Sequence, residues 1–398
     1  MAGFLFDILS LYDKIKFMKI YDTIIIGAGA AGLMAAAQLV QHKKSVLILD
    51  MGDKPARKIA ISGGGNCNFT NMRADYTHYF GKNPRFVMSA LNQFSPNDML
   101  NWVKRHNIKY IEKEPGRFFC KDGADKIVQA LMQDIKTVQI KYNTKVIDVG
   151  KTDDKFTVTT DHGEFIAVSI IVATGGISYP HLLVSDIGHK IAKKFGHKIE
   201  TLRPALCAIK TKAFDSALAG ISLPVEITIG KHKIIDDLLF THFGIGGPAV
   251  YRASLITPKL FTINFAPNTD VFELLKSVKQ KNGKKSVTGA ISELLPNKLA
   301  RFLCTDNRHI ADLKDSELKQ IAIKINKFAI NDGTTIGFQS AEVMFGGVSV
   351  DNISSKTMES KLCSGLFFAG EVMDVTGDLG GFNIQWALSS GFVAGNNA

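Results

Sequence analysis

Residues 21–50 contain three glycines and an aspartate whose types and spacing suit the binding of a dinucleotide. Gly27, Gly29 and Gly32 fill a G-x-G-x-x-G pattern, in which the first allows a tight turn, the second lets the backbone approach a diphosphate, and the third permits close helix packing. Asp50 follows, where a carboxylate can accept hydrogen bonds from ribose hydroxyls and would repel a 2′-phosphate. The pattern predicts an adenine dinucleotide, and leaves NAD and FAD as alternatives.

Three elements must position these residues. The apolar, β-branched run 23–26 predicts a buried parallel strand, and 45–49 predicts a second strand. Between them, residues 30–42 are mostly strong helix formers. The N-terminus of that helix offers unpaired N–H groups and a positive dipole end, which favour an anionic diphosphate.

A second glycine-rich stretch follows, from Lys58 to Asn71. The consecutive glycines at 63–65 would expose backbone N–H groups, and Asn68 adds an amide partner. The stretch therefore predicts a second ligand-facing loop. Cys67 could be a redox thiol, but a packed small residue is the better interpretation.

Two later predicted strands are also followed by glycine. Thr174 and Gly175 follow the strand 169–173, and Gly370 and Glu371 follow a strand near the C-terminus. Residues 380–383 then precede a helix expected from about 384 to 394, whose N-terminal dipole would suit a ring carbonyl or developing negative charge. Since ligands bind at the carboxyl ends of strands in doubly wound sheets, these segments predict one crevice.

The connecting regions are predicted with less detail. Residues 84–135 are expected to be mainly helical, with an interruption at 115–120. Four strands, at 138–142, 145–149, 156–160 and 164–168, are expected to form a small antiparallel excursion, in which Val146 is a candidate for backbone contact with adenine. Antiparallel strands and then helices are expected from about 196 to 335.

Composition limits the class of protein. With 398 residues, the chain exceeds the usual size of one domain, and its 45% hydrophobic and 21% charged residues are typical of a globular protein. No apolar run approaches the roughly 20 residues needed to span a bilayer. The five cysteines show no C-x-x-C spacing, so we expect no metal site and no disulfide framework, and a cytoplasmic setting. The net charge of +11 comes from lysines spread along the chain, with one cluster at 276–285.

The motifs together resemble a known family. The glycine fingerprint, the Lys58–Asn71 block, the Gly346 and Gly347 pair and residues 380–387 are similar to the bacterial HI0933-like or aminoacetone-oxidase-family flavoproteins, which also include a bile-acid 4,6-dehydro reductase. The resemblance implies an α/β fold, with a Rossmann-like FAD domain of the two-dinucleotide-binding type interrupted by an inserted β-barrel-like and helical domain. Two departures are Asp50, where Glu is common, and Asn66, where Arg is common.

The implied organisation has four segments. Residues 1–17 are an extension or a misassigned start, 18–195 are the first part of the FAD domain, 196–335 the insertion, and 336–398 the second part. The residues expected to bind FAD are Gly27, Ala28, Gly29, Ala31, Gly32, Asp50, Lys58, Gly63, Gly64, Gly65, Asn68, Val146, Ala173, Thr174, Gly175, Gly370, Glu371, Gly380, Gly381, Phe382 and Asn383.

Three functions follow from this interpretation. The favoured one is an FAD-dependent oxidoreductase that transfers hydride between NAD(P)H or a small organic substrate and an enone-type compound or oxygen. The alternatives are an FAD-dependent RNA-modifying or RNA-binding protein, and a non-catalytic redox module. The catalytic acid or base is not identified, and Tyr179, His242 and Cys67 are weak candidates. No membrane span is expected, and the oligomeric state is open.

Overall fold

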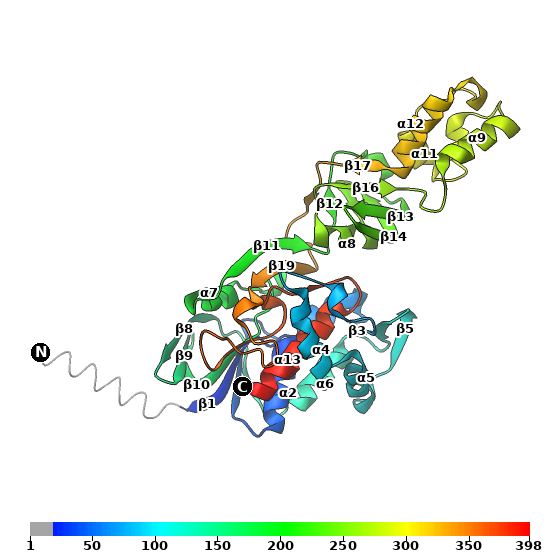
Figure 1. Ribbon diagram of the computed structural model, residues 1–398. Helices are drawn as coiled ribbons and strands as arrows, with labels where there is room; N and C mark the ends of the chain where they lie inside the picture. The colour runs from blue at the N-terminus through cyan, green and yellow to red at the C-terminus, as the bar shows by residue number, and fades with distance from the viewer. Residues whose placement is uncertain (1–18) are drawn as a thin grey trace, which may run out of the picture. The chain divides into compact units, whose positions relative to one another are not determined.

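The computed structural model describes residues 19–398 (Figure 1). The expectation for residues 1–17 lies outside this range. The chain forms two compact units: the first runs up to Arg203 and resumes from Val343 to Ala398, and the second is the segment Pro204–Glu342 between these two parts. Each unit has its own buried apolar cluster. None of the described helices has the length and apolar character to cross a membrane.

The first unit is built on a seven-stranded sheet. Its strand order is β7-β2-β1-β10-β9-β8, with β20 also paired to β10. The pairs of β1 with β2, β1 with β10, β2 with β7 and β10 with β20 are parallel, whereas β9 is antiparallel to β8 and β10. The strands are β1 (Ile20–Ile26), β2 (Val46–Leu49), β7 (Gln139–Lys141), β8 (Val146–Thr152), β9 (Lys155–Thr160), β10 (Gly163–Val172) and β20 (Leu366–Phe368).

The predicted β-α-β start is confirmed. Helix α2 (Ala30–Gln41) joins β1 to β2, and all four residues of β2 are buried. Inside the sheet, the hydroxyls of Thr23 on β1 and Ser169 on β10 lie 2.9 Å apart and form a buried hydrogen bond. Each of these two buried hydroxyls thus has a hydrogen-bond partner in the core.

Two details of the predicted strands were wrong. The separate strands expected at 164–168 and 169–173 are one strand, β10, whose first half pairs with β9 and whose second half pairs with β20. The strand expected at 138–142 is β7, which joins the parallel edge beside β2 instead of the antiparallel excursion. Hydrophobic periodicity predicts a strand but not the strand with which it pairs, because pairing depends on residues far away in the sequence.

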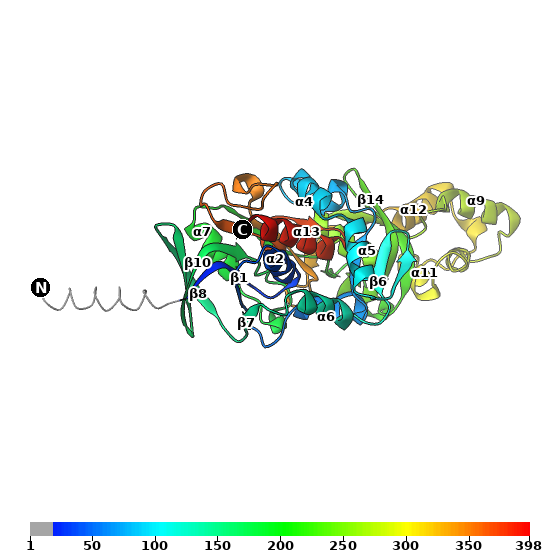
Figure 2. The ribbon, with the colours of Figure 1, turned by 90° about the horizontal axis from the view of Figure 1, so that it is seen from below.

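The last helix, α13 (Phe382–Asn397), lies beside α2 (Figure 2). A Cβ on Gly391 would lie 2.3 Å from Ala31 O, and one on Gly395 would lie 2.3 Å from Ala35 O. Small residues one turn apart therefore let the two backbones approach closely. The helix begins two residues earlier and ends three residues later than predicted.

The expectation of a mainly helical region at 84–135 was partly wrong. Helices α4 (Met88–Gln93), α5 (Pro96–Arg105) and α6 (Asp125–Asp134) are present, and Ser95 and Asp98 form a capping box at the start of α5. Between α5 and α6, however, strands β5 (Tyr110–Glu114) and β6 (Arg117–Cys120) form a hairpin. Strand β6 also pairs with β3 (Asn68–Asn71), which places the hairpin beside the second glycine loop.

Short elements complete the first unit. They are α3 (Arg57–Ile61), the 3-10 turn η1 (Ser62–Gly65), β4 (Tyr79–Phe80), α7 (Ile187–Lys194), β11 (Ile199–Ala205, which extends into the second unit), β19 (Val343–Val348), η8 (Gly370–Val372) and β21 (Thr376–Gly377). Strand β4 pairs with β21, and β11 with β19.

The second unit is an antiparallel sheet with helices. The strand order is β17-β16-β13-β14-β15-β12-β18. No pairing between the edge strands β17 and β18 is found among the described residues, so the β-barrel-like form of this unit stays a prediction. The strands are β12 (Ile209–Lys210), β13 (Ser222–Ile229), β14 (His232–Thr241), β15 (Gly244–Gly246), β16 (Phe261–Asn264), β17 (Phe328–Ile330) and β18 (Thr334–Thr335). The helices are α8 (Pro248–Ile256), α9 (Val271–Lys281), α10 (Val287–Ile291), α11 (Asn297–Leu303) and α12 (Asp315–Asn326). Its core includes an aromatic cluster in which Phe214 packs against Phe240, Phe265 and Phe328.

Candidate functional site

The segments that follow β1, β2 and β10 lie together at one edge of the sheet. Gly27 N donates to Leu49 O at 2.8 Å, and Ala173 N donates to Ile26 O at 2.9 Å. Beyond the strands, Ala28 N donates to Asp50 Oδ2 at 2.7 Å. The first glycine turn, the acidic residue and the Ala173–Gly175 segment are therefore neighbours, as the sequence predicted from the ends of parallel strands.

The three fingerprint glycines have different surroundings. Gly27 has φ +111°, and a Cβ there would lie 2.4 Å from Ala173 O. A Cβ on Gly32 would lie 2.0 Å from Gly27 O, so this glycine is required by the packing of α2 against the turn. Gly29, in contrast, has φ −80°, and a Cβ would meet nothing within 4 Å. Its backbone faces open space at the start of α2, where a diphosphate would be placed.

Asp50 is held in a network that the sequence did not reveal. Its Oδ2 accepts from Ala28 N, while Oδ1 accepts from Gly52 N at 2.7 Å and from Arg57 Nη2 at 3.1 Å. A carboxylate has about four acceptor positions, so these three bonds leave one on Oδ2 for a ribose hydroxyl. Arg57 was missed, although its place next to Lys58 could have drawn attention to it.

Lys58 and Glu371 form an ion pair across the site. Lys58 Nζ lies 2.6 Å from Glu371 Oε2, and Glu371 Oε1 accepts from Met344 N at 2.8 Å. The pair joins α3 to the turn after β20, although 313 positions separate the two residues. Both were predicted as cofactor-binding residues, but their mutual contact appears only in the tertiary structure.

The loop 63–65 is a tight turn with left-handed backbone torsions. Gly63, Gly64 and Gly65 have φ of +56°, +64° and +87°, and a Cβ on Gly64 or Gly65 would meet nothing within 4 Å. Cys67, which follows, is fully buried, and burial raises the pKa of its thiol to about 12. A thiol in this state is a packed residue and not a nucleophile at neutral pH.

Strand β3 supports the turn that begins α13. Asn71 Nδ2 donates to Gly380 O at 2.8 Å, and the Asn68 amide, oriented to suit its neighbours, accepts from Gly381 N at 3.2 Å. Gly381 has φ +94°, and a Cβ there would lie 2.6 Å from Thr70 O. The second glycine loop and the C-terminal motif thus meet, as predicted.

The first residues of α13 have their own partners. The Asn383 amide donates to Gly377 O at 2.9 Å and accepts from Gly377 N at 2.8 Å, so it fixes the preceding loop. Phe382 is buried and stacks on the ring of His78, with centroids 4.6 Å apart at an angle of 16°. His78 Nδ1 lies 3.9 Å from Asp378 Oδ2. Neither His78 nor Asp378 was predicted as a site residue.

The other predicted residues are spread more widely. Val146 is buried at the start of β8 and pairs with Thr160; nearby, Thr144 N donates to Asp50 O at 2.9 Å. Tyr179 follows the Ala173–Gly175 segment with φ +57°. His242 is exposed in the second unit, between β14 and β15. None of the weak acid or base candidates is therefore assigned a catalytic role.

The residues present fit an adenine dinucleotide with an extended head group. An acceptor position remains on Asp50, open space lies over Gly29, and a cradle of positive-φ glycines occurs at 63–65 and at 380–381. A second β-turn-α glycine fingerprint is absent from the sequence. These features favour FAD over NAD as the dinucleotide bound at the glycine fingerprint.

Comparison with known proteins decides the family. The family model described as "HI0933-like protein Rossmann domain" matches residues 21–397. The chain belongs to the HI0933-like family. This confirms the family that the motifs resemble, a family of FAD-binding Rossmann flavoprotein oxidoreductases.

Curated relatives span nearly the whole chain. A protein of Haemophilus influenzae named "Ribosomal RNA dihydrouridine synthase" is 40% identical, over 93% of this chain and 96% of its own length. A protein of the same name from Escherichia coli is 36% identical, over 94% and 96%. The "3-dehydro-bile acid delta(4,6)-reductase" of Clostridium scindens is 27% identical, over 94% and 98%.

Solved structures agree in fold. The Sdh1 complex of Mycobacterium smegmatis in the apo form matches with a TM-score of 0.50 and 14% identity, over 95% of this chain and 68% of that chain. At this identity the similarity concerns the fold alone. It supports the Rossmann-like architecture of this HI0933-like protein.

Proposed function

We propose that this HI0933-like protein uses FAD to reduce the C5=C6 bond of uridine in ribosomal RNA. The observation that carries the proposal is the 40% and 36% identity, over almost full length, to two proteins named ribosomal RNA dihydrouridine synthase. The C5=C6 bond of uracil is conjugated to the C4 carbonyl, so it belongs to the enone-type acceptors expected from the sequence. NADH or NADPH would supply the hydride and solvent the proton, giving NAD(P)⁺ and dihydrouridine.

The chain supplies binding and positioning for this reaction. FAD, when bound, provides two-electron hydride chemistry. Asp50 would accept a hydrogen bond from a ribose hydroxyl, and the backbone at Gly29 would face the diphosphate. The Lys58–Glu371 ion pair would keep α3 and the turn after β20 in place next to the flavin head.

The charge of the chain supports an RNA substrate. A net charge of +11 attracts a phosphate backbone, and the lysines of the second unit include a cluster at 276, 279, 281, 284 and 285. Some of these are neutralised: Lys276 pairs with Glu273, Lys279 with Asp315. The electrostatic contribution should therefore be moderate, and binding should weaken as salt rises.

Turnover with defined substrates tests the proposal. The purified FAD-loaded protein is mixed with NADH or NADPH and either a uridine-containing ribosomal RNA fragment or a bile-acid enone, and dihydrouridine is measured by nucleoside mass spectrometry. We expect dihydrouridine from the RNA, with anaerobic bleaching of the flavin band at ~450 nm by the competent donor. Reduction of the bile-acid enone with no dihydrouridine from any RNA would contradict the proposal and favour a small-molecule reductase.

A further inference from the structure

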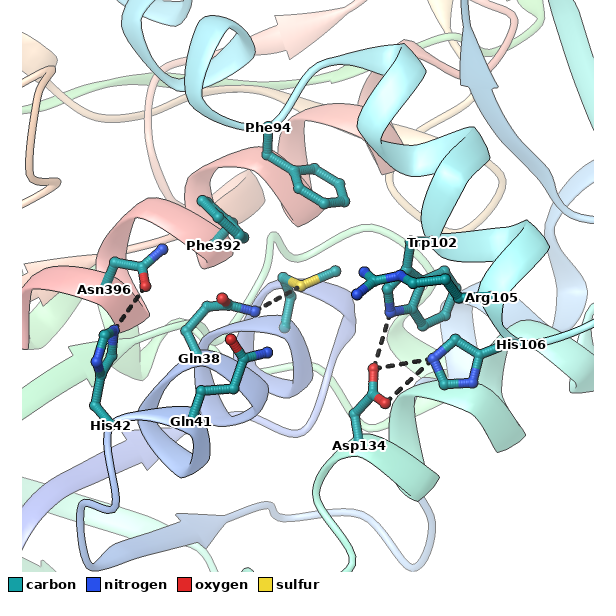
Figure 3. Close-up of a pocket in the computed structure, with 11 residues that line it drawn as sticks. Gln38, Gln41, His42, Phe94, Trp102, Arg105, His106, Asp134, Phe392 and Asn396 are labelled. Atoms are coloured by element: carbon teal, nitrogen blue, oxygen red, sulfur yellow. Dashed lines mark hydrogen bonds and ion pairs between the residues drawn. The ribbon is translucent and has the colours of Figure 1, made fainter.

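A pocket on the outer side of α2 is separate from the glycine fingerprint. It has a volume of about 470 Å³ and lies among α2, α5, α6 and α13 of the first unit (Figure 3). Its residue Gln38 is nine positions beyond Gly29, about 13 Å along the helix axis. The volume lies within the range of about 300–1,000 Å³ that is typical of small-molecule sites.

The floor of the pocket contains a buried amide that lacks a strong partner. Gln38 is only 6% exposed, and its Nε2 donates to Met34 Sδ at 3.7 Å. A thioether is a weak acceptor. The amide oxygen accepts no hydrogen bond from the described residues and is not among the fully buried polar atoms, so it is open to the pocket. Since its N–H has only a weak partner and its oxygen is open to the pocket, this amide is suited to a ligand that offers one donor and one acceptor side by side.

The walls add aromatic surface and charge. Phe94 and Phe392 stack with centroids 5.1 Å apart and cover one side. On the other side, Asp134 accepts from Trp102 Nε1 at 2.8 Å and lies 3.1 Å from His106 Nε2. These contacts hold its carboxylate at the pocket, with acceptor positions remaining for a hydroxyl.

Arg105 completes the set of groups. It is exposed at the end of α5, and Figure 3 shows its guanidinium reaching back toward Gln38. No acidic partner of Arg105 occurs in the part of the chain that the structure describes. An uncommitted guanidinium at the rim is suited to a phosphate, which it binds in a planar, bidentate manner.

We propose that this pocket binds a mononucleotide. The base would pair its donor and acceptor edge with the Gln38 amide, the ribose would donate to Asp134, and the phosphate would contact Arg105. The same chemistry is offered by a free nucleotide and by one nucleotide of an RNA strand. The proposal does not depend on the reaction proposed above, because none of these residues belongs to the flavin-binding set.

Calorimetric titration of the FAD-loaded full-length protein tests the site, since FAD keeps the fingerprint occupied. The probes are UMP, AMP, uridine and a short oligouridylate. We expect saturable binding of UMP or AMP, weaker binding of uridine, and at least a tenfold loss of UMP affinity in both Gln38→Leu and Arg105→Ala. Lys104→Ala removes the same charge from the preceding, exposed position and should leave the affinity unchanged.

The outcomes are separable. Arg105 is exposed, so its variant should fold even if Gln38→Leu does not. Tighter binding of oligouridylate than of UMP would identify an RNA strand as the source, and equal binding a free nucleotide. Absence of saturable binding by every probe at millimolar concentration, or equal UMP binding by Arg105→Ala and the parent protein, would overturn the proposal.

Discussion

The two ends of the proposed FAD site are built in different ways. The diphosphate end consists of residues 27–32 and Asp50, all within one β-α-β unit. The ring end consists of residues 58–71, 370–371 and 380–383, which are joined by contacts such as Asn71 to Gly380 and Lys58 to Glu371. The diphosphate end is formed by one continuous stretch of sequence. The ring end forms only when the C-terminal segment packs against the earlier part of the chain.

This difference predicts different responses to mutation. At the diphosphate end, one glycine supports packing and another faces open space, so stability and binding can be separated by neighbouring substitutions. At the ring end, side chains such as Asn383 hold other loops, so a substitution should disturb both the fold and the flavin environment.

The largest expected effect is that of Gly32→Val. Its Cβ would lie 2.0 Å from Gly27 O, a backbone atom that cannot move without breaking the turn. We expect a loss of at least about 3 kcal/mol in the free energy of unfolding, measured by denaturant titration of FAD-free protein. Wild-type stability of this variant would show that α2 does not pack on the turn as described.

Gly29→Val is the matched substitution three residues earlier. Since no atom lies within 4 Å of the added Cβ, the FAD-free protein should unfold at the parent temperature. The larger side chain should nevertheless block the diphosphate and lower FAD affinity about 100-fold or more, or roughly 2.7 kcal/mol. FAD content after purification, from visible absorbance, measures this effect. A fully yellow variant would refute the placement of the diphosphate.

Asn383→Leu tests the ring end. It removes two hydrogen bonds to Gly377 and leaves that backbone N–H without its partner, which should cost about 1–3 kcal/mol in stability. FAD should still bind through the intact diphosphate end, with an altered visible spectrum and slower reduction by NAD(P)H. Asn397→Leu, near the end of the same helix, is the control and should change neither property. An unchanged spectrum in Asn383→Leu would place the flavin head elsewhere.

The smallest expected effect concerns Asp374, between Glu371 and Gly377. Its side chain is buried, Oδ2 accepts from Lys82 N at 2.8 Å, and burial raises the pKa of its carboxyl. A carboxyl whose folded-state pKa is raised stabilises the fold below its ordinary range of about 4, and this contribution is lost as pH rises through the folded pKa. Asp374→Asn should therefore be more stable than the parent at neutral pH, with a gap that closes on acidification. Melting temperatures across pH 4 to 7 check the sign, and a gap independent of pH would contradict it.

A large part of the fold could be predicted because it is locally encoded. The β1-α2-β2 unit combines an apolar strand period, glycines at turn positions and an alanine-rich helix, and each favours the same structure. The hairpin β5–β6 was missed because its strands are mostly exposed or half buried and show no clear alternation, as at the exposed Glu112 and Glu114. The merging of two predicted strands into β10 depends on pairing with β20, roughly 200 positions later.

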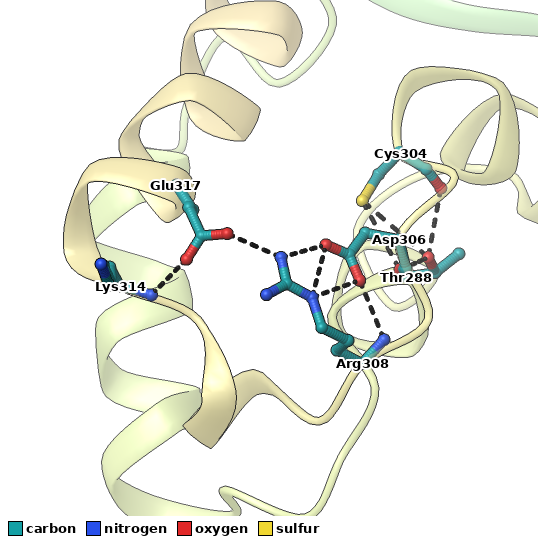
Figure 4. Close-up of polar contacts among 6 residues, drawn as sticks. All are labelled: Thr288, Cys304, Asp306, Arg308, Lys314 and Glu317. Carbon is teal, nitrogen blue, oxygen red and sulfur yellow. Dashed lines mark hydrogen bonds and ion pairs between the residues drawn. The ribbon is translucent and has the colours of Figure 1, made fainter.

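The second unit shows a different limit of prediction. Helices were predicted in this part of the chain, but the ion pairs of Arg308 with Asp306 and Glu317 were not (Figure 4). The Arg308 guanidinium lowers the pKa of both carboxyls, and the cluster lies at the surface. Charge pairing of this kind depends on where a loop and a helix start come together, which the order of residues alone does not give.

The sequence by itself predicted an adenine dinucleotide and the place of its diphosphate, because the glycine spacing, the helix start and Asp50 lie within one stretch whose local geometry is nearly fixed. Only the tertiary structure decided which side chains surround the ring end and the outer pocket. Arg57 beside Asp50, His78 stacked on Phe382, and Phe94 stacked on Phe392 are contacts made by packing of separate elements. Packing of this kind is a property of the whole core, in which many weak contacts are optimised together.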